Sequence, residues 1–148
     1  MPDLVSIFRI RIVACNPKNE GQETAPLEAL VDTSTDLTWL PAEVLWSIGV
    51  TPRRKKSFAT PDGGTLVRNV GYAILRADGR DGYETADEVV FAEPGDRTRL
   101  GVRTLQSFGI EMQAAPQNAQ PRFIGLTTLA AFNKETKEKA VFKFYLKV

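Results

Sequence analysis

The stretch Glu28–Pro41, EALVDTSTDLTWLP, holds the features around which the rest of the chain can be interpreted. Its apolar run Ala29–Val31 predicts a buried strand that delivers a carboxylate, Asp32. Hydroxyl residues follow at Thr33–Thr35, and a second acid, Asp36, precedes another apolar patch. Hydroxyl and backbone N–H groups in such a turn can hydrogen-bond one carboxylate and fix its orientation. The simpler alternative is an Asx-turn or a helix N-cap, where Asp is also common.

A second stretch, Arg99–Met112, RLGVRTLQSFGIEM, adds a glycine-bounded helix signal. Leu100-Gly101 opens the predicted helix 102–108, Leu105 lies within it, and Gly109-Ile110 follows it. Together, the two stretches resemble the retropepsin-like (retroviral-type) aspartic proteases. That family pairs an apolar-apolar-Asp-Thr-Gly turn with an apolar-Gly step into a short helix, and Leu30–Thr33 matches the first of these motifs. The resemblance covers roughly residues 4–113.

The resemblance implies an all-β fold, the retropepsin-like acid protease β-barrel, with one or two short helices and a single lobe. We expect the protease domain to cover residues 1–124. Residues 125–148 extend beyond the minimal family domain, and we expect this extension of unknown role to pack on the same domain. The sequence departs from the family pattern in two places. Ser34 stands where the family has glycine, and Val102 stands where retroviral members usually have arginine, with Arg103 one position later.

The resemblance also implies a mechanism, aspartic peptide hydrolysis by two carboxylates that share one proton. The chain has one Asp-Thr motif, so the catalytic Asp32 would face Asp32 of a second copy in a homodimer. The site would be supported by Thr33, Ser34, Asp36 and Gly101. Peptide or protein would be the substrate, and an extended segment would bind like an added strand.

A β-hairpin is predicted over 57–75, because two extended arms flank a turn sequence. The turn consists of Pro61, Asp62, Gly63 and Gly64. An ordinary surface hairpin is one interpretation. In the family, a glycine-rich hairpin at this place in the chain is the flap that closes over substrate, and its position between the two motifs favours the flap.

Composition excludes several other classes of function. The 148 residues suit one domain, and they include no His and a single cysteine, Cys15. Catalysis by Ser-His-Asp or Cys-His groups and a His-ligated zinc site are therefore excluded, and no cofactor or metal is expected. The formal net charge of +1 gives no global field for nucleic acid or membrane, and no apolar run reaches membrane-spanning length. A cytoplasmic location is the default expectation.

Elsewhere, alternation and turn residues predict strands at 4–13, 27–31, 71–76, 84–91, 110–112, 123–124 and 140–148. Short helices are predicted at 41–48 and 126–132, and a polar loop is predicted at 16–25. The charge run Arg53–Lys56 is interpreted as a solvated strand end rather than as a site for an anionic partner.

Two functional alternatives remain open. One is a catalytically weak or inactive dimer of the same fold that acts as a peptide-binding or assembly module. The other is an unrelated small β-barrel binding module, which would leave the spacing of the two motifs as coincidence.

Overall fold

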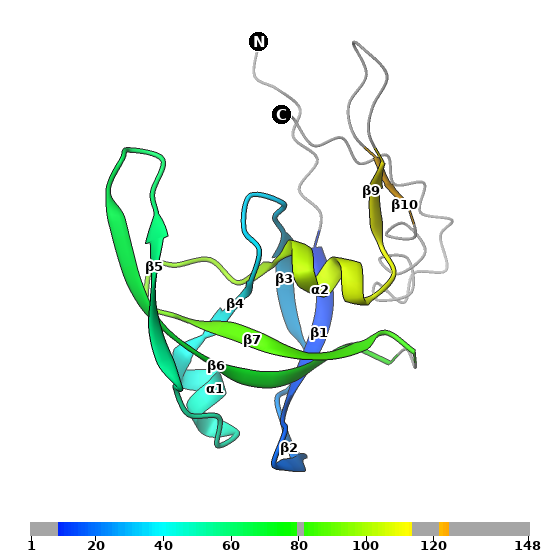
Figure 1. The fold of residues 1–148 in the computed structure, drawn as a ribbon. Coiled ribbons are helices and arrows are strands. Elements are labelled where there is room, and N and C mark those ends of the chain that lie inside the picture. The colour runs from blue at the N-terminus through cyan, green and yellow to red at the C-terminus, as the bar shows by residue number, and fades with distance from the viewer. Residues whose placement is uncertain (1–8, 80–81, 114–121, 125–148) are drawn as a thin grey trace.

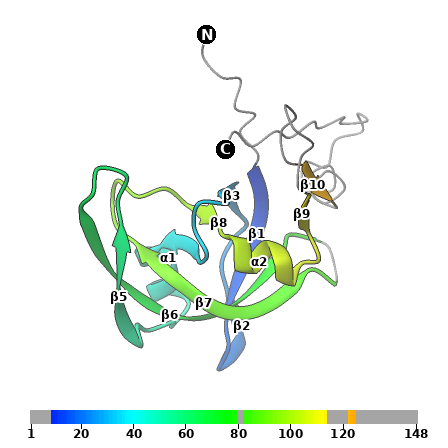
Figure 2. The ribbon, with the colours of Figure 1, turned by 45° about the horizontal axis from the view of Figure 1, so that its top comes forward.

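The computed structural model describes residues 9–79, 82–113 and 122–124. Figure 1 shows a β-rich fold with two short helices, and Figure 2 shows it turned towards the viewer. The elements are β1 (Arg9–Asn16), β2 (Asn19–Glu23), β3 (Leu27–Val31), β4 (Thr38–Pro41), α1 (Ala42–Ser47), β5 (Arg54–Ala59), β6 (Thr65–Ala77), β7 (Glu84–Ala92), β8 (Arg99–Leu100), α2 (Val102–Ser107), β9 (Glu111–Gln113) and β10 (Arg122–Ile124).

The main sheet closes on itself. Its eight strands follow the order β2-β1-β3-β8-β4-β7-β6-β5, and a further pairing joins β1 to β6. This pairing completes a ring that runs from β1 through β3, β8, β4, β7 and β6 back to β1. Strands β2 and β5 lie outside the ring and extend it. The expected all-β barrel with short helices is confirmed.

Side chains at alternating positions of the strands fill the interior of the barrel. Ile10 and Ile12 of β1 are fully buried, whereas Arg9 is exposed, so the two faces of this strand separate as the sequence pattern predicts. Ala73 and Leu75 of β6 face the same core. A second, smaller cluster lies at the base of the β5–β6 hairpin and comprises Leu37, Trp39, Val70, Val90 and Ala92, with Phe58 packed against it.

Both predicted helices in the described region are present. Helix α1 follows Pro41 and ends before Gly49, whose φ of 81° lies in the left-handed region that favours glycine. Helix α2 follows Gly101 and buries Leu105 against the barrel. Each helix has six residues, fewer than two turns, and depends on packing against the barrel, because isolated helices of this length are not stable in water.

Most sequence expectations for strands are confirmed, including the short strand β10 at 122–124. The predicted loop 16–25 is wrong, because strand β2 forms within it and pairs with β1. Every residue of β2 is exposed, so no hydrophobic pattern marks this strand in the sequence. The predicted helix 126–132, the predicted strand 140–148 and the extension 125–148 lie outside the described residues. In the described part of the chain, no helix is both long and apolar enough to span a bilayer.

Candidate active site

Asp32 follows the last residue of β3, where that strand runs parallel to β8. The register places Leu30 beside Arg99 and Val31 beside Leu100. The backbone N–H of Asp32 donates to the carbonyl of Leu100 at 3.1 Å and continues this pairing one residue further. The two motifs, about seventy residues apart in the chain, are thus joined through their backbones at the candidate catalytic residue.

The Asp32 carboxylate is held on both oxygens. Oδ1 accepts hydrogen bonds from the Ser34 backbone N–H at 2.8 Å and from the Ser34 hydroxyl at 2.5 Å. The first of these is an Asx-turn, so the simpler interpretation of the motif describes its local geometry correctly. Oδ2 lies 3.6 Å from Nη1 of Arg99. The side chain of Asp32 retains 23% of its exposure, so the carboxylate is held in place but remains accessible.

Arg99 is the site residue that sequence reasoning missed. Its guanidinium lies 4.7 Å from the ring centroid of Trp39, a cation–π contact, while it also approaches Asp32. Its Nε is buried and has no hydrogen-bond partner among the described residues. The signal that could have revealed Arg99 is its place directly before Leu100-Gly101, the start of the second motif.

Gly101 lies where no side chain fits. A Cβ at this position would be 2.5 Å from the carbonyl carbon and oxygen of Leu37 and 2.6 Å from the carbonyl oxygen of Asp36. Its N–H donates to the hydroxyl of Thr38 at 3.0 Å, and that buried hydroxyl also bonds the hydroxyl of Thr104 at 2.6 Å. Gly101 therefore lets the start of α2 lie directly against the turn that follows Asp32.

Backbone hydrogen bonds join the start of α2 to the turn that follows Asp32. Val102 and Arg103 donate their N–H groups, each at 3.0 Å, to the carbonyls of Thr35 and Asp36. The side chain of Arg103 instead pairs with Asp87 of β7 at 2.7 Å. Asp36 therefore reaches α2 through its main chain, and its side chain is exposed.

The turn has further internal bonds. The hydroxyl of Thr35 donates to the carbonyl of Leu37 at 3.1 Å and accepts from the indole N–H of Trp39 at the same distance. Thr33, between Asp32 and Ser34, is partly buried. Trp39 thus contributes to the site by fixing the turn and by supporting Arg99, and it belongs to the core rather than to an exposed ligand platform.

The predicted hairpin forms from β5 and β6. At its tip, Asp62 accepts hydrogen bonds from the hydroxyl of Thr60 and from the N–H of Gly64, the latter at 3.0 Å. These bonds lower the pKa of Asp62, the contribution from Thr60 being the largest. Gly63 has a φ of 87°, and its N–H donates to the carbonyl of Thr60 at 3.0 Å, so the four predicted tip residues do form the turn.

The base of the hairpin is anchored to the barrel. Arg68 of β6 makes two hydrogen bonds to Asp96, at 2.7 and 3.1 Å, and both side chains are largely buried. This pairing lowers the pKa of Asp96. Phe58 of β5 packs on Trp39 with ring centroids 4.9 Å apart. The hairpin is therefore connected, through Trp39, to the same side of the barrel as Arg99.

The structure brings Asp32, Ser34 and Gly101 into one cluster, with Asp36 joined to it by its backbone. The tip residues 61–64 lie apart from that cluster at the far end of the hairpin. Figures 1 and 2 show the tip and the β3–β4 turn on the same side of the molecule. Across the described ranges, no group of three or more potential metal-ligating side chains occurs.

Comparison with solved structures matches this fold to a structure described as EIAV protease complexed with the inhibitor HBY-793. The match has a TM-score of 0.53 and 18% sequence identity, and it covers 77% of this chain and 99% of the other. No protein-family model matches the sequence, and no curated protein matches it significantly. At this identity the similarity concerns the fold, and the predicted retropepsin-like fold is confirmed.

Proposed function

We propose that this protein is an aspartic endopeptidase whose dyad consists of Asp32 from each subunit of a homodimer. The observation that carries the proposal is the placement of Asp32. It lies at the end of β3, it is bonded through its backbone to Leu100, and the glycine-led helix α2 supports its turn. This arrangement occurs in a fold that spans nearly the whole of a retroviral protease chain.

The proposed chemistry needs two carboxylates in different protonation states. Two carboxylates held close together cannot both ionise, so the pair retains one proton over a broad acidic range. The ionised member takes a proton from water as the oxygen attacks the peptide carbonyl. The protonated member gives its proton to the carbonyl oxygen. The tetrahedral intermediate collapses when the carboxyl group that took the proton from water gives it to the amine nitrogen, while the other carboxylate takes its proton back from the hydroxyl group. The C–N bond then breaks, and the pair again holds one proton.

Dimerisation follows from this mechanism, because one chain supplies a single aspartate of the required kind. An obligate interface should bury more than roughly 2,000 Å² in total. Thr33 would hydrogen-bond across the two-fold axis, and the hairpin with Gly63 and Gly64 at its tip would close over substrate. Light scattering at tens of micromolar should detect a dimer, and a strictly monomeric protein would contradict the mechanism.

The direct test is peptide cleavage by the wild type and by Asp32→Asn. Casein or a peptide library is incubated at about pH 4–6, the range in which such a dyad holds one proton, with and without a pepstatin-like inhibitor. We expect cleavage by the wild type that the inhibitor blocks and that Asp32→Asn abolishes, because an amide cannot act as the ionised partner. Glu20→Gln, on the exposed strand β2, removes one acid away from the site and should retain activity. Equal cleavage by Asp32→Asn and wild type would refute the proposal.

A second candidate is a catalytically weak or inactive dimer that binds peptide or serves in assembly. It is favoured by the partners of Asp32, because the Ser34 hydroxyl occupies Oδ1 and Arg99 approaches Oδ2. Both contacts compete with the water and the shared proton that catalysis needs. Calorimetry with a cleavable substrate peptide, combined with the cleavage assay, distinguishes the two candidates, since a binding module would bind that peptide without any turnover.

A cytoplasmic location belongs to the same proposal, together with a peptide or protein substrate and the absence of nucleic-acid or membrane partners. Cell fractionation with an antibody to the protein tests the location.

A further inference from the structure

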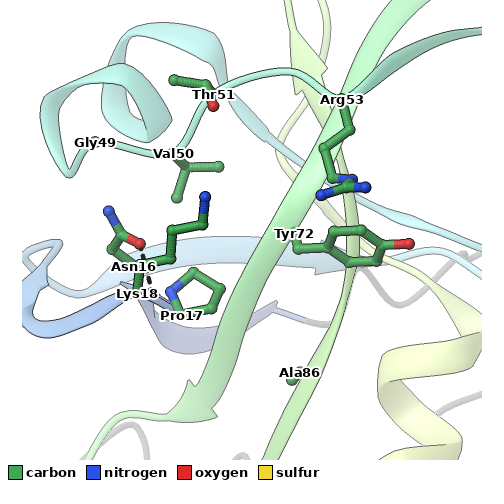
Figure 3. Close-up of a pocket in the computed structure, with 9 residues that line it drawn as sticks. All are labelled: Asn16, Pro17, Lys18, Gly49, Val50, Thr51, Arg53, Tyr72 and Ala86. Carbon is green, nitrogen blue, oxygen red and sulfur yellow. Dashed lines mark hydrogen bonds between the residues drawn. The ribbon is translucent and has the colours of Figure 1, made fainter.

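A pocket of about 390 Å³ lies away from Asp32, beside the connector from α1 to β5. Figure 3 shows it between this connector, the β1–β2 turn and strands β6 and β7. Tyr72 and Ala86 line it from the strands. Tyr72 is 47% exposed, while its neighbour Ala73 is fully buried, so the tyrosine ring lies on the outer face of the barrel.

The walls of this pocket are fixed to one another. The buried amide of Asn16 donates to the carbonyl of Ile48 at 2.9 Å, while its oxygen accepts the N–H of Lys18 at 2.8 Å. Gly49 completes the wall with a φ of 81°, and a Cβ there would be 2.9 Å from Nδ2 of Asn16. The N–H of Arg53 donates to the carbonyl of Val70 at 2.7 Å, which anchors the connector to β6. The cavity is therefore largely formed before any ligand arrives.

The pocket carries positive charge without a matching acid. Lys18 and Arg53 line it from two different segments, and neither forms an ion pair within the described residues. The guanidinium of Arg53 lies 5.1 Å from the ring centroid of Tyr72 (Figure 3). Glu88, opposite Tyr72 in the strand register, is engaged by Arg54 through two hydrogen bonds of 2.9 and 3.0 Å.

We propose that this pocket binds a small aromatic anion, a flat apolar ring that bears one carboxylate, sulfonate or phosphate group. The ring would lie against Tyr72 and the apolar side chains of Pro17 and Val50. The anion would meet Arg53 and Lys18, the two cations of the lining, which have no carboxylate partner in the part of the chain that the structure describes. An aromatic surface beside a guanidinium suits a ligand that is both flat and negatively charged. Because none of the lining residues belongs to the Asp32 cluster, this site is independent of the proposed peptidase activity.

The test uses three probes that separate ring from charge. Naphthalene-2-sulfonate carries both, naphthalene-2-methanol carries the ring alone, and methanesulfonate carries the charge alone. Each is titrated into the ¹⁵N-labelled protein, and the amide resonances of Gly49, Thr51 and Ala86 are followed. We expect saturable shifts at these amides with naphthalene-2-sulfonate, and weaker binding of each of the other two probes.

Two variants and one matched control complete the test. Arg53→Gln should weaken naphthalene-2-sulfonate binding by roughly two- to fivefold, the range for one partly exposed cation–π and charge contact. Tyr72→Leu removes the aromatic face and should also weaken binding. Lys55→Gln removes an exposed charge from the neighbouring strand β5 and should leave binding unchanged. Fingerprint spectra of each variant show whether the fold is retained.

Three results would each overturn the proposal. The first is the absence of saturable shifts at the pocket amides, and the second is equal affinity for naphthalene-2-methanol and naphthalene-2-sulfonate. The third is a loss of naphthalene-2-sulfonate affinity in Lys55→Gln as large as that in Arg53→Gln.

Discussion

Replacing Gly101 by alanine should damage the fold at the place where the candidate site is built. The new Cβ would lie 2.5 Å from the Leu37 carbonyl group and 2.6 Å from the Asp36 oxygen. These are backbone atoms, so the clash cannot be relieved by the movement of a flexible side chain. The helix start and the β3–β4 turn must separate instead.

The magnitude can be worked from the contacts. Overpacking of a tight core typically costs about 1–3 kcal/mol. Separation would also lengthen the bond from the Gly101 N–H to the Thr38 hydroxyl, a contribution of about 1 kcal/mol. The sum, about 3 kcal/mol, corresponds to roughly a hundredfold change in the unfolding equilibrium. For a chain of this length, the melting temperature should fall by roughly 6–12 °C.

The assay is thermal and urea unfolding of Gly101→Ala followed by circular dichroism, with Gly21→Ala as the matched control. Gly21 lies in the exposed strand β2, and a Cβ there would meet only Asn19 Oδ1, at an ordinary contact distance of 3.4 Å. The control should stay within about 0.5 kcal/mol of the wild type. If Gly101→Ala proves as stable as Gly21→Ala, then α2 does not lie against the turn in the way the structure describes.

Three further predictions concern the side chains around the site. Ser34→Gly should raise kcat/KM for peptide cleavage by about ten- to a hundredfold, because it frees Oδ1 of Asp32 and lets substrate backbone approach the turn. Ser34→Ala distinguishes the effect of the hydroxyl from that of the Cβ. Equal or lower kcat/KM in the glycine variant would show that the serine is accommodated. Arg99→Gln should lower the free energy of unfolding by about 1 kcal/mol through the lost cation–π and ion-pair contacts. A double-mutant cycle with Asp32→Asn measures the coupling energy between Arg99 and Asp32. A coupling energy of zero would exclude the ion pair in solution. Arg68 lowers the pKa of Asp96, so Asp96 stabilises the fold above its unfolded-state pKa, and this contribution is lost as the pH falls through its folded-state pKa. The difference in melting temperature between wild type and Asp96→Asn should therefore be largest near neutral pH and shrink below about pH 4. A difference that does not change with pH would contradict the pairing.

Local signals in the sequence determined the elements that depend on neighbouring residues, through the alternation of buried and exposed positions and through turn residues. Alternating Ile10 and Ile12 define β1, and Pro41 and Gly49 bound α1. Asp62 with Gly63 marks the hairpin tip, because a carboxylate and a residue that tolerates positive φ are what such a turn requires. The same local logic predicted a rigid turn at Asp32, and the Asx geometry there needs only neighbouring residues.

The tertiary structure alone decided what depends on segments far apart in the chain. Strand β2 exists because β1 offers it hydrogen-bond partners, although no residue of β2 is buried. The parallel pairing of β3 with β8 brings Arg99 to Asp32, and the barrel brings Thr38 to Thr104. Periodicity reports which face of a segment is buried, but it does not report which segment covers that face. That choice is made by closing the whole barrel, because the core must be covered while most buried backbone groups find hydrogen-bond partners.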